Sequence, residues 1–246
     1  MNGNKILLNN LRSNNINLIK ESLEKIGDLN LKIAIDPIID LINNTESEEI
    51  IDAAIWTLSR IAPIDKLIDL LKIDNETILY YTIEALGRLN ATGSARFIRE
   101  FLDHSNPKIR AIATWTIGKI YDVNSYNKLI ELLKNDSSPE VRTNAAWALK
   151  KINVLESLKI LEQQKFIEKD ESVLYNIDEA IKSIESSYNI NPDREIEIYK
   201  CKFMDNYCNE QNKEHFEFKD SQIYIKITCA NFCIKSKICN LIIKRL

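Results

Sequence analysis

The stretch RTNAAWALKKI (142–152) recurs along this chain in degenerate form. Its relatives are IDAAIWTLSRI (51–61), LYYTIEALGRL (79–89), RAIATWTIGKI (110–120), LYNIDEAIKSI (174–184) and, most weakly, INLIKESLEKI (16–26). Counted at position 8 of the eleven, successive copies are 35, 28, 31, 32 and 32 residues apart (Leu23, Leu58, Leu86, Ile117, Leu149, Ile181). A period near 30 residues with helical patterning predicts stacked helix pairs. The fold class is therefore mainly α, a solenoid of five to six repeats.

Each repeat also has a first helix before the quoted one, expected at 36–44, 63–72, 94–103, 125–134 and 155–164. Asn106-Pro107 and Ser138-Pro139 place a capping side chain before a proline at the first helical position. Apolar residues at positions 8 and 11 form part of a helical stripe, and we expect them to be buried between layers: Leu58, Ile61, Leu86, Leu89, Ile117, Ile120, Leu149 and Ile152. Gly87 and Gly118, both within a helix, predict close helix crossings there.

Composition places the chain among globular proteins, with 246 residues, 45% hydrophobic and 28% charged. Its apolar runs are too short to span a bilayer, and its start lacks the pattern of a signal peptide, so we expect a cytoplasmic protein. Residues 1–193 carry 23 basic and 29 acidic side chains, and residues 194–246 carry 10 and 7, giving net charges of −6 and +3. The acidic repeat region disfavours general binding to nucleic acid.

A polar segment with Pro192, SSYNINPDR (186–194), interrupts the helical pattern and predicts a domain boundary. We expect a repeat domain over 1–187, a linker over 188–194 and a small β-rich module over 195–246. Alternating apolar and polar residues predict its strands at 194–203, 214–220 and 221–229. The tail ICNLIIKRL fits either a strand or a short helix.

All five cysteines lie in this module, at 201, 208, 229, 233 and 239. Thiolates clustered in a small intracellular domain favour a metal site, because a metal supplies stability that a small core lacks. The ligands would be Cys201, Cys208, Cys229 and Cys233, with Cys239 as a substitute, and the metal zinc or, less favoured, an iron–sulfur cluster. Without a CxxC pair, buried reduced thiols and redox-active thiols are the alternatives.

The second helices predict one polar and aromatic stripe. Position 6 holds tryptophan or glutamate: Glu21, Trp56, Glu84, Trp115, Trp147 and Glu179. Position 10 is mostly basic, with Lys25, Arg60, Arg88, Lys119 and Lys151, and position 2 adds Tyr80 and Tyr175. Residues four apart share one side of a helix, so each indole faces a cation. If these helices line the concave side, the stripe forms a groove for a protein segment or a flat aromatic ligand. Alternatively, each indole packs only on its own cation.

Catalytic patterns are absent from the sequence. The two histidines, His104 and His215, have no patterned carboxylate partners, and there is no P-loop, dinucleotide fingerprint, nucleophile elbow or zincin motif. The sequence therefore favours a non-enzymatic role, with no membrane contact expected.

The phrases PEVRTNAAWALKKI, PKIRAIATWTIGKI and TILYYTIEALGRL resemble HEAT-like repeats of the phycobilisome-lyase type, over roughly residues 14–187. Such repeats occur in bilin lyases, in deoxyhypusine hydroxylase and in many scaffolds. The resemblance implies turn-to-helix ion pairs, here Asp103 with Arg110 and Asp136 with Arg142. The hydroxylase relies on His-Glu dipeptides, which this chain lacks, so the resemblance does not extend to that activity.

Together these features predict an adaptor or assembly factor that holds a partner protein in the groove of the solenoid. The resemblance offers a bilin-lyase-like, chromophore-handling protein as the alternative, which would make a lyase-like attachment reaction the enzymatic possibility. A HEAT-type nucleic-acid-binding protein is the second alternative. The sequence does not identify the partner or the oligomeric state.

Overall fold

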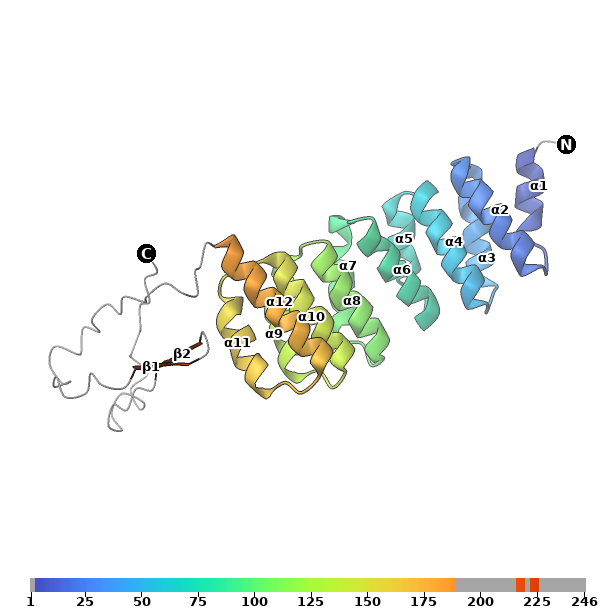
Figure 1. The fold of residues 1–246 in the computed structure, drawn as a ribbon. Coiled ribbons are helices and arrows are strands. Elements are labelled where there is room, and N and C mark those ends of the chain that lie inside the picture. Colours follow the sequence, from blue (N-terminus) through green and yellow to red (C-terminus); the bar gives the residue numbers. More distant parts are fainter. Residues whose placement is uncertain (1–2, 189–215, 220–221, 226–246) are drawn as a thin grey trace. The chain divides into compact units, whose positions relative to one another are not determined.

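The computed structural model describes residues 3–188, 216–219 and 222–225 (Figure 1). Contacts divide the chain into two units, residues 1–184 and 185–246, and each unit is considered by itself. Within residues 3–188 the chain forms helices joined by short turns, with 3-10 segments η1 (Lys32–Ala34), η2 (Thr92–Ser94) and η4 (Val123–Ser125) ahead of three of the first helices. No helix in the described part of the chain is long and apolar enough to cross a membrane.

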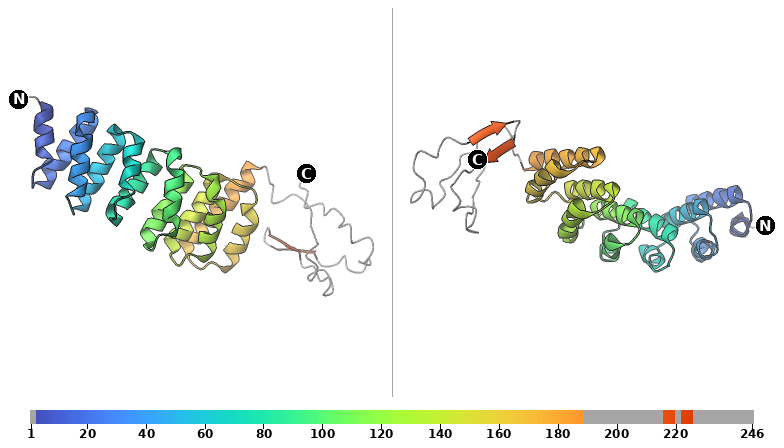
Figure 2. Two further views of the ribbon diagram at one scale, coloured as in Figure 1. Left: turned by 180° about the vertical axis from the view of Figure 1, so that it is seen from behind. Right: turned by 90° about the horizontal axis from the view of Figure 1, so that it is seen from below.

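The helices of residues 3–188 pair into six repeats. In chain order the helices are α1 (Gly3–Asn10), α2 (Ile16–Asp28), α3 (Ile35–Asn43), α4 (Glu48–Ile61), α5 (Ile64–Leu70), α6 (Glu76–Arg88), α7 (Ala95–Ile98) continued by η3 (Arg99–Asp103), α8 (Pro107–Lys119), α9 (Tyr126–Asn135), α10 (Pro139–Ile152), α11 (Ser157–Ile167) and α12 (Glu171–Ser187). Figure 2 shows two layers, one of odd-numbered and one of even-numbered helices. Viewed from below, the even-numbered layer lies on the inner side of a shallow bend. The predicted α-solenoid is confirmed, and α1 is a first helix that the sequence pattern missed.

The register of the first repeat differs from the prediction by three residues. The hydroxyl of Thr116 at position 7 donates to the carbonyl of Ile83, position 5 of the preceding repeat, over 3.0 Å. Thr57 makes the equivalent bond to the Leu23 carbonyl over 3.3 Å, so Leu23 occupies position 5 and not position 8. The turn GDLN (27–30) then aligns with GRLN (87–90). In the corrected register Glu24 and Asp28 take positions 6 and 10, and Glu21 and Lys25 leave the predicted stripe.

The core lies between the two layers and between neighbouring repeats. Of the eight residues predicted to be buried at positions 8 and 11, seven are at most 9% exposed. Leu89, the C-cap of α6, is the exception at 39%, whereas Ile120, the C-cap of α8, is 3% exposed. The even-numbered helices supply an unbroken run of buried apolar side chains, including Leu58, Leu86, Ile117 and Leu149, each at 0%. This continuous burial holds the helices in one parallel row.

Several helix boundaries follow from local chemistry. Asn15, Asn75 and Asn106 accept hydrogen bonds from the first N–H groups of α2, α6 and α8. Pro107 and Pro139 begin α8 and α10, as the sequence predicts. Just beyond the C-terminal ends of α2, α6, α8 and α10 the backbone takes a positive φ, at Asn30, Asn90, Tyr121 and Asn153. Asparagine tolerates this left-handed conformation, whereas tyrosine adopts it at a steric cost.

Gly87 and Gly118 allow close approach between neighbouring even-numbered helices, as predicted. A methyl group at Gly87 would lie 2.7 Å from both Trp115 Cζ3 and Thr116 Oγ1. At Gly118 it would lie 2.7 Å from Trp147 Cζ3 and 2.8 Å from Ala148 Cα. Each glycine therefore provides the space in which the indole of the next repeat rests.

In the second unit, strand β1 (Phe216–Lys219) pairs antiparallel with β2 (Gln222–Ile225), with Phe216 opposite Ile225 and Lys219 opposite Gln222. Both strands fall within stretches where strands are predicted. The predicted strand at 194–203 and the five cysteines lie outside the described residues, so the predicted metal site stays a prediction.

Candidate functional site

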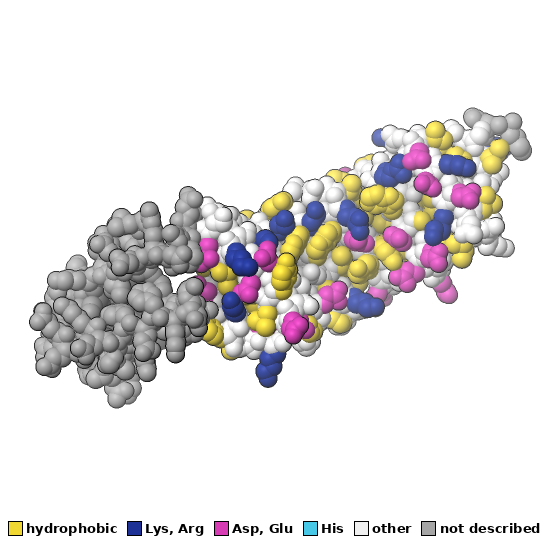
Figure 3. Space-filling model, in the orientation of Figure 1, with side chains coloured by type: hydrophobic (Ala, Val, Ile, Leu, Met, Phe, Trp, Pro, Cys, Tyr) yellow, Lys and Arg dark blue, Asp and Glu magenta, His cyan; other side chains and the backbone are white. Residues whose placement is uncertain are grey.

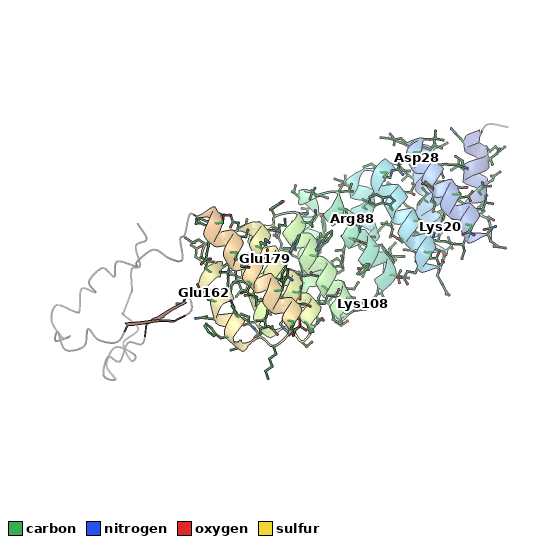
Figure 4. The ribbon with its side chains drawn as sticks, viewed as in Figure 1. Lys20, Asp28, Arg88, Lys108, Glu162 and Glu179 are labelled. Atoms are coloured by element: carbon green, nitrogen blue, oxygen red, sulfur yellow. The ribbon has the colours of Figure 1, made fainter. Side chains whose placement is uncertain are left out.

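The exposed side of the even-numbered helices carries nearly all the residues of the predicted stripe, and we call it the aromatic face. Its members are Trp56, Trp115, Trp147, Tyr80, Tyr175, Arg60, Arg88, Lys119, Lys151, Glu84 and Glu179. Figure 3 shows hydrophobic side chains in the middle of this face, with several Lys and Arg along the upper edge of its central part and several Asp and Glu along the lower edge, although charges of both signs occur on both edges. Arg88 and Lys108 mark the two opposite edges in Figure 4.

The two charged edges follow from the parallel arrangement of the helices. First turns carry Glu48 and Glu49 in α4, Glu76 in α6 and Glu140 in α10. Last turns carry Arg60, Arg88, Lys119 and the pair Lys150 and Lys151. Acids near helix N-termini and bases near C-termini complement the helix dipole, so part of this pattern stabilises the helices themselves. Because the helices run the same way, α4, α6 and α10 together give this part of the face one acidic and one basic edge.

Trp115 and Trp147 stack on each other across adjacent repeats. Their ring centroids are 6.3 Å apart and their planes 15° from parallel. Both side chains are part-buried, with one edge on the glycine of the preceding helix. The ammonium of Lys119 lies 5.8 Å from the Trp115 ring centroid, and that of Lys151 lies 5.3 Å from Trp147. The result is a rigid apolar strip flanked by two cations.

Trp56 differs from the other two indoles. Its side chain is 48% exposed. Arg60, predicted to face it, instead extends to the preceding helix, where its guanidinium lies 2.7 Å from Asp28 Oδ1 and packs over Gly27. Within residues 3–188 the cation–π contacts of tryptophan involve only Trp115 and Trp147. Trp56 therefore presents its indole to solvent without a cation of its own repeat over the ring.

Glu84 occupies the tryptophan position in the repeat between Trp56 and Trp115. It accepts two hydrogen bonds from Arg88, at 2.6 and 3.1 Å, as the four-residue spacing predicts. Glu179, at the same position in α12, contacts Lys150 and Lys182 at 3.2 and 3.6 Å. Both acids are thus neutralised by nearby cations. Tyr175, one turn earlier in α12, is 66% exposed.

The acidic edge near α4 and α6 contains Asp52, a residue that the stripe analysis left out. Burial, and next the negative charge of Glu84, raise the pKa of the Asp52 carboxyl above its usual range. Neighbouring Tyr81 donates its hydroxyl to Glu48 over 2.9 Å, and burial followed by this bond raises the pKa of Tyr81 to about 12. Tyr80 packs edge-on against Tyr81, with ring centroids 5.3 Å apart. Asp52 is the only acid at position 2 of the repeats, so the repeat pattern does not point to it.

The predicted turn-to-helix ion pairs exist in a different form. Arg110 pairs with Asp136 of the following repeat through bonds of 2.7 and 2.9 Å, and not with Asp103. Arg142 likewise pairs with Glu168 at 2.8 and 2.9 Å, and not with Asp136. Each arginine also donates to two carbonyls of its own turn, which for Arg110 are those of His104 and Ser105. The pairs therefore join consecutive repeats, and their role is structural.

Charge and turn chemistry explain where these pairs occur. Aligning Pro107 with Pro139 places His104 where the next turn has Asp136. The His104 ring nitrogen accepts the backbone N–H of Asn106, just as Asp136 accepts that of Ser138. His104 is thus a part-buried turn residue. The repeat before it has Leu79 at position 1 and no arginine, so no carboxylate is needed there.

A shallow pocket of about 470 Å³ lies on the odd-numbered layer between α5 and α7. It occurs where the repeat spacing falls to 28 residues and no 3-10 segment precedes α5. Ile64, Ile68 and Phe97 supply apolar lining, and Asp69, Lys72 and Arg96 supply charge. Lys72 is already paired with Asp69 at 2.7 Å, and Arg96 lies over the Phe97 ring. The short repeat spacing can be read from the sequence, but the pocket that accompanies it cannot.

Comparison with known proteins agrees with this architecture. A family model of HEAT repeats matches residues 64–150 and, in an overlapping alignment, residues 96–172. No curated protein matches the chain. The X-ray structure of YibA of Escherichia coli is similar with a TM-score of 0.51 and 18% identity, over 73% of this chain and 67% of that one. Residues 64–172 are therefore similar to HEAT repeats, and residues 3–188 form a helical-repeat solenoid.

Two further structures align at lower TM-scores. Computationally designed armadillo repeat proteins for modular peptide recognition align with a TM-score of 0.45 and 19% identity, over 72% of this chain and 98% of that one. The complex of CpcE and CpcF of phycocyanin lyase from Nostoc sp. PCC7120 gives 0.31 and 15%, over 74% and 94%. These values carry no conclusion about function, and the resemblance to the phycobilisome-lyase type stays a prediction.

Proposed function

We propose that this protein is a non-enzymatic adaptor that binds a segment of a partner protein along the aromatic face. The observation that carries the proposal is the state of its three indoles. Trp56 is 48% exposed, and Trp115 and Trp147 form one stacked, part-exposed strip on the same row of helices. Tryptophan anchors interfaces well because it combines a large apolar area with a polar N–H group.

Rigidity of the stacked pair supports this role. Trp115 and Trp147 are fixed by each other, by the glycines beneath them and by the lysines above. Side chains that are already ordered lose little conformational entropy when a partner binds, so more of the contact energy contributes to affinity. The strip is therefore suited to receive aliphatic or aromatic side chains.

The alternative interpretation, in which each indole serves only to pack against its own cation, accounts for Trp115 and Trp147 but not for Trp56. Arg60 is engaged with Asp28, so the Trp56 ring gains no such contact from its own repeat. About half of the Trp56 surface stays in contact with water, and covering that apolar area would be favourable. Recognition of a partner explains its presence.

Site-specific photocrosslinking tests the proposal. A photoreactive amino acid replaces Trp56 in one sample and Phe166 in another, and the full chain is irradiated in extract of its source cells. Phe166 is the control because it is aromatic, 59% exposed and on α11 in the opposite layer. We expect a discrete crosslinked protein from position 56 only, with purified partner binding weakened at least tenfold by Trp56→Ala and unchanged by Phe166→Ala. Equal crosslinking from both positions would refute a specific aromatic face.

A second candidate function rests on the same stacked indoles. Two nearly parallel rings with ammonium groups over them also suit a flat conjugated ligand bearing carboxylates, such as a bilin. Adding a bilin to the purified protein tests this: a bound chromophore gives a shifted visible band that Trp147→Ala abolishes. An unchanged spectrum would leave protein binding as the role of the strip.

For the cysteine-rich segment we retain zinc binding as a proposal based on the sequence. Protein purified without chelators should contain about one zinc per chain, and Cys201→Ser with Cys229→Ser should remove it. A brown protein containing iron would indicate a cluster, and metal-free protein would favour reduced thiols.

A further inference from the structure

The two ends of the aromatic face differ in how many of its cations are already neutralised. Near the N-terminal end, Arg60 is bound to Asp28 at 2.7 Å and Arg88 to Glu84 at 2.6 Å. Near the C-terminal end, Lys119 and Lys151 contact the indoles, and no carboxylate lies within ion-pair distance of either ammonium in residues 3–188. Uncompensated positive charge on this face is therefore concentrated over α8 and α10.

Apart from Glu140, the acids of the face show the reverse distribution. In α12, Glu179 is neutralised by Lys150 and Lys182. In α4, Asp52 has no cation within ion-pair distance in the described helices, and Glu48 accepts only the Tyr81 hydroxyl. Burial, and next the charge of Glu84, raise the pKa of Asp52, while the more distant charges of Arg88 and Lys20 lower it in part. The exposed Glu140 lies at the first turn of α10, eleven residues from Lys151 in sequence and so about 16 Å away along the helix.

An apolar path connects the two charged ends. Trp56 and Tyr80 lie next to the acidic end, and Trp115 and Trp147 lie next to the basic end. Neighbouring helices are about 9 Å apart, and eight residues along a helix span about 12 Å. Asp52 and Lys119, two helices and eight positions apart, are therefore separated by about 22 Å. An extended peptide covers that distance with six or seven residues.

We propose that the aromatic face recognises a linear segment with separated charges, basic residues over α4 and α6 and acidic residues over α8 and α10, with apolar residues between them. This inference rests on the proposed function and specifies the chemistry of its partner. Charge complementarity fixes the placement of the segment, because a uniformly acidic or basic peptide would meet like charge at one end. The indoles supply affinity, and the charged ends supply register.

Selection from a random peptide library tests the inference. The full-length protein serves as bait for twelve-residue peptides displayed on phage, selected at low ionic strength where exposed charges are least screened. We expect enriched peptides to carry basic and acidic residues about six positions apart, with an apolar residue between. Enriched peptides with mixed charge order, or with charge of one sign only, would overturn the inference.

Variants then assign each charge to its place. In the double variant Lys119→Ser, Lys151→Ser the preference for acidic residues should disappear while that for basic residues remains. The affinity of a selected peptide should fall roughly 2- to 30-fold, as expected for two exposed ion pairs. The control Lys134→Ser, Lys159→Ser removes the same charge from exposed positions of α9 and α11 and should leave binding unchanged. An equal loss in the control would indicate general attraction and not a site.

The same selection separates this inference from the proposed function. Peptides that lose binding in Trp56→Ala or Trp147→Ala but show no charge separation would support the aromatic face and refute the charge rule. Peptides that bind these tryptophan variants as tightly as the wild type would refute the proposed function itself. The absence of any enriched peptide would count against docking of a linear segment.

Discussion

The two halves of the solenoid join neighbouring repeats in different ways. In the C-terminal half, Arg110–Asp136 and Arg142–Glu168 link consecutive repeats, and both carboxylates are only 4% exposed. In the N-terminal half, the ion pairs between repeats are Lys20–Glu49, Arg60–Asp28 and Lys66–Asp36, whose side chains are 35–84% exposed. Exposed pairs contribute little, so the N-terminal half depends on apolar burial, whereas the C-terminal half depends also on buried charge.

The largest expected difference comes from breaking a buried pair. Arg142→Ala leaves Glu168 charged and without its main partner, which should lower the free energy of unfolding by about 3–5 kcal/mol. Arg60→Ala, the matched change in the N-terminal half, should cost at most about 1 kcal/mol. Urea unfolding followed by tryptophan fluorescence and circular dichroism measures both variants. Similar losses would show that the two halves are joined in the same way.

Acid should weaken the C-terminal half first. Hydrogen bonds from Arg142, outweighing burial, lower the pKa of Glu168 from 4.5 to about 2. A lowered carboxyl pKa contributes stability that is complete above pH 4.5 and is lost as the pH falls towards 2, at most about 3 kcal/mol here. Glu168→Gln should flatten the dependence of stability on pH in that window. Hydrogen exchange at pH 3 should then show protection lost in α10 to α12 before α2 to α4; the opposite order would contradict the comparison.

Asp52 serves as a control because its pKa is shifted in the opposite direction to that of Glu168. Its pKa is raised by burial and then by Glu84, so its ionisation opposes folding as the pH rises through that pKa. Asp52→Asn should leave neutral-pH stability unchanged or slightly higher while weakening any basic ligand. A clear loss of stability in this variant would mean that Asp52 has a structural role.

Replacing a glycine by alanine should change stability in opposite directions in the two halves. A methyl group at Gly118 meets the backbone of Ala148 at 2.8 Å, so Gly118→Ala should destabilise by about 1–3 kcal/mol despite its higher helix propensity. At Gly27 the methyl meets the guanidinium of Arg60 at 2.7 Å, the flexible end of a long side chain. Gly27→Ala should therefore be neutral or stabilise by up to about 1 kcal/mol. Thermal melting of both variants checks the signs, and a stabilising Gly118→Ala would show that the helices can separate without loss.

The repeat architecture was predictable because apolar periodicity and capping residues act locally. For the first and weakest repeat the sequence predicts a register that is three residues off, because its apolar residues fit two alignments. The turn Gly27-Asp28-Leu29-Asn30, matching Gly87 to Asn90, was the better guide, since it encodes the backbone conformation at the end of the helix.

The site was predictable only as a set of residues sharing one face. Spacing within a helix cannot tell whether an arginine contacts its own repeat or a neighbouring one. Arg60 contacts the preceding repeat, and Arg110 and Arg142 contact the following one. For Arg60 the partner depends on the close approach that Gly27 allows. The stacking of Trp115 on Trp147 likewise depends on Gly87 and Gly118, whose close crossing was expected but whose contact with the indoles was not.

The smallest expected effect concerns the turn that joins α8 to η4, near the middle of the solenoid. Tyr121 has a φ of 56°, where the equivalent residues are Asn30, Asn90 and Asn153. Its ring is 59% exposed, so replacing it removes little buried area. Asparagine fits the left-handed region better, and Tyr121→Asn should stabilise the protein by up to about 1 kcal/mol. A small rise in the melting temperature is expected; a fall would mean that the Tyr121 ring makes a contact within the fold that is worth more than the strain of its backbone, and would give this ring a structural role.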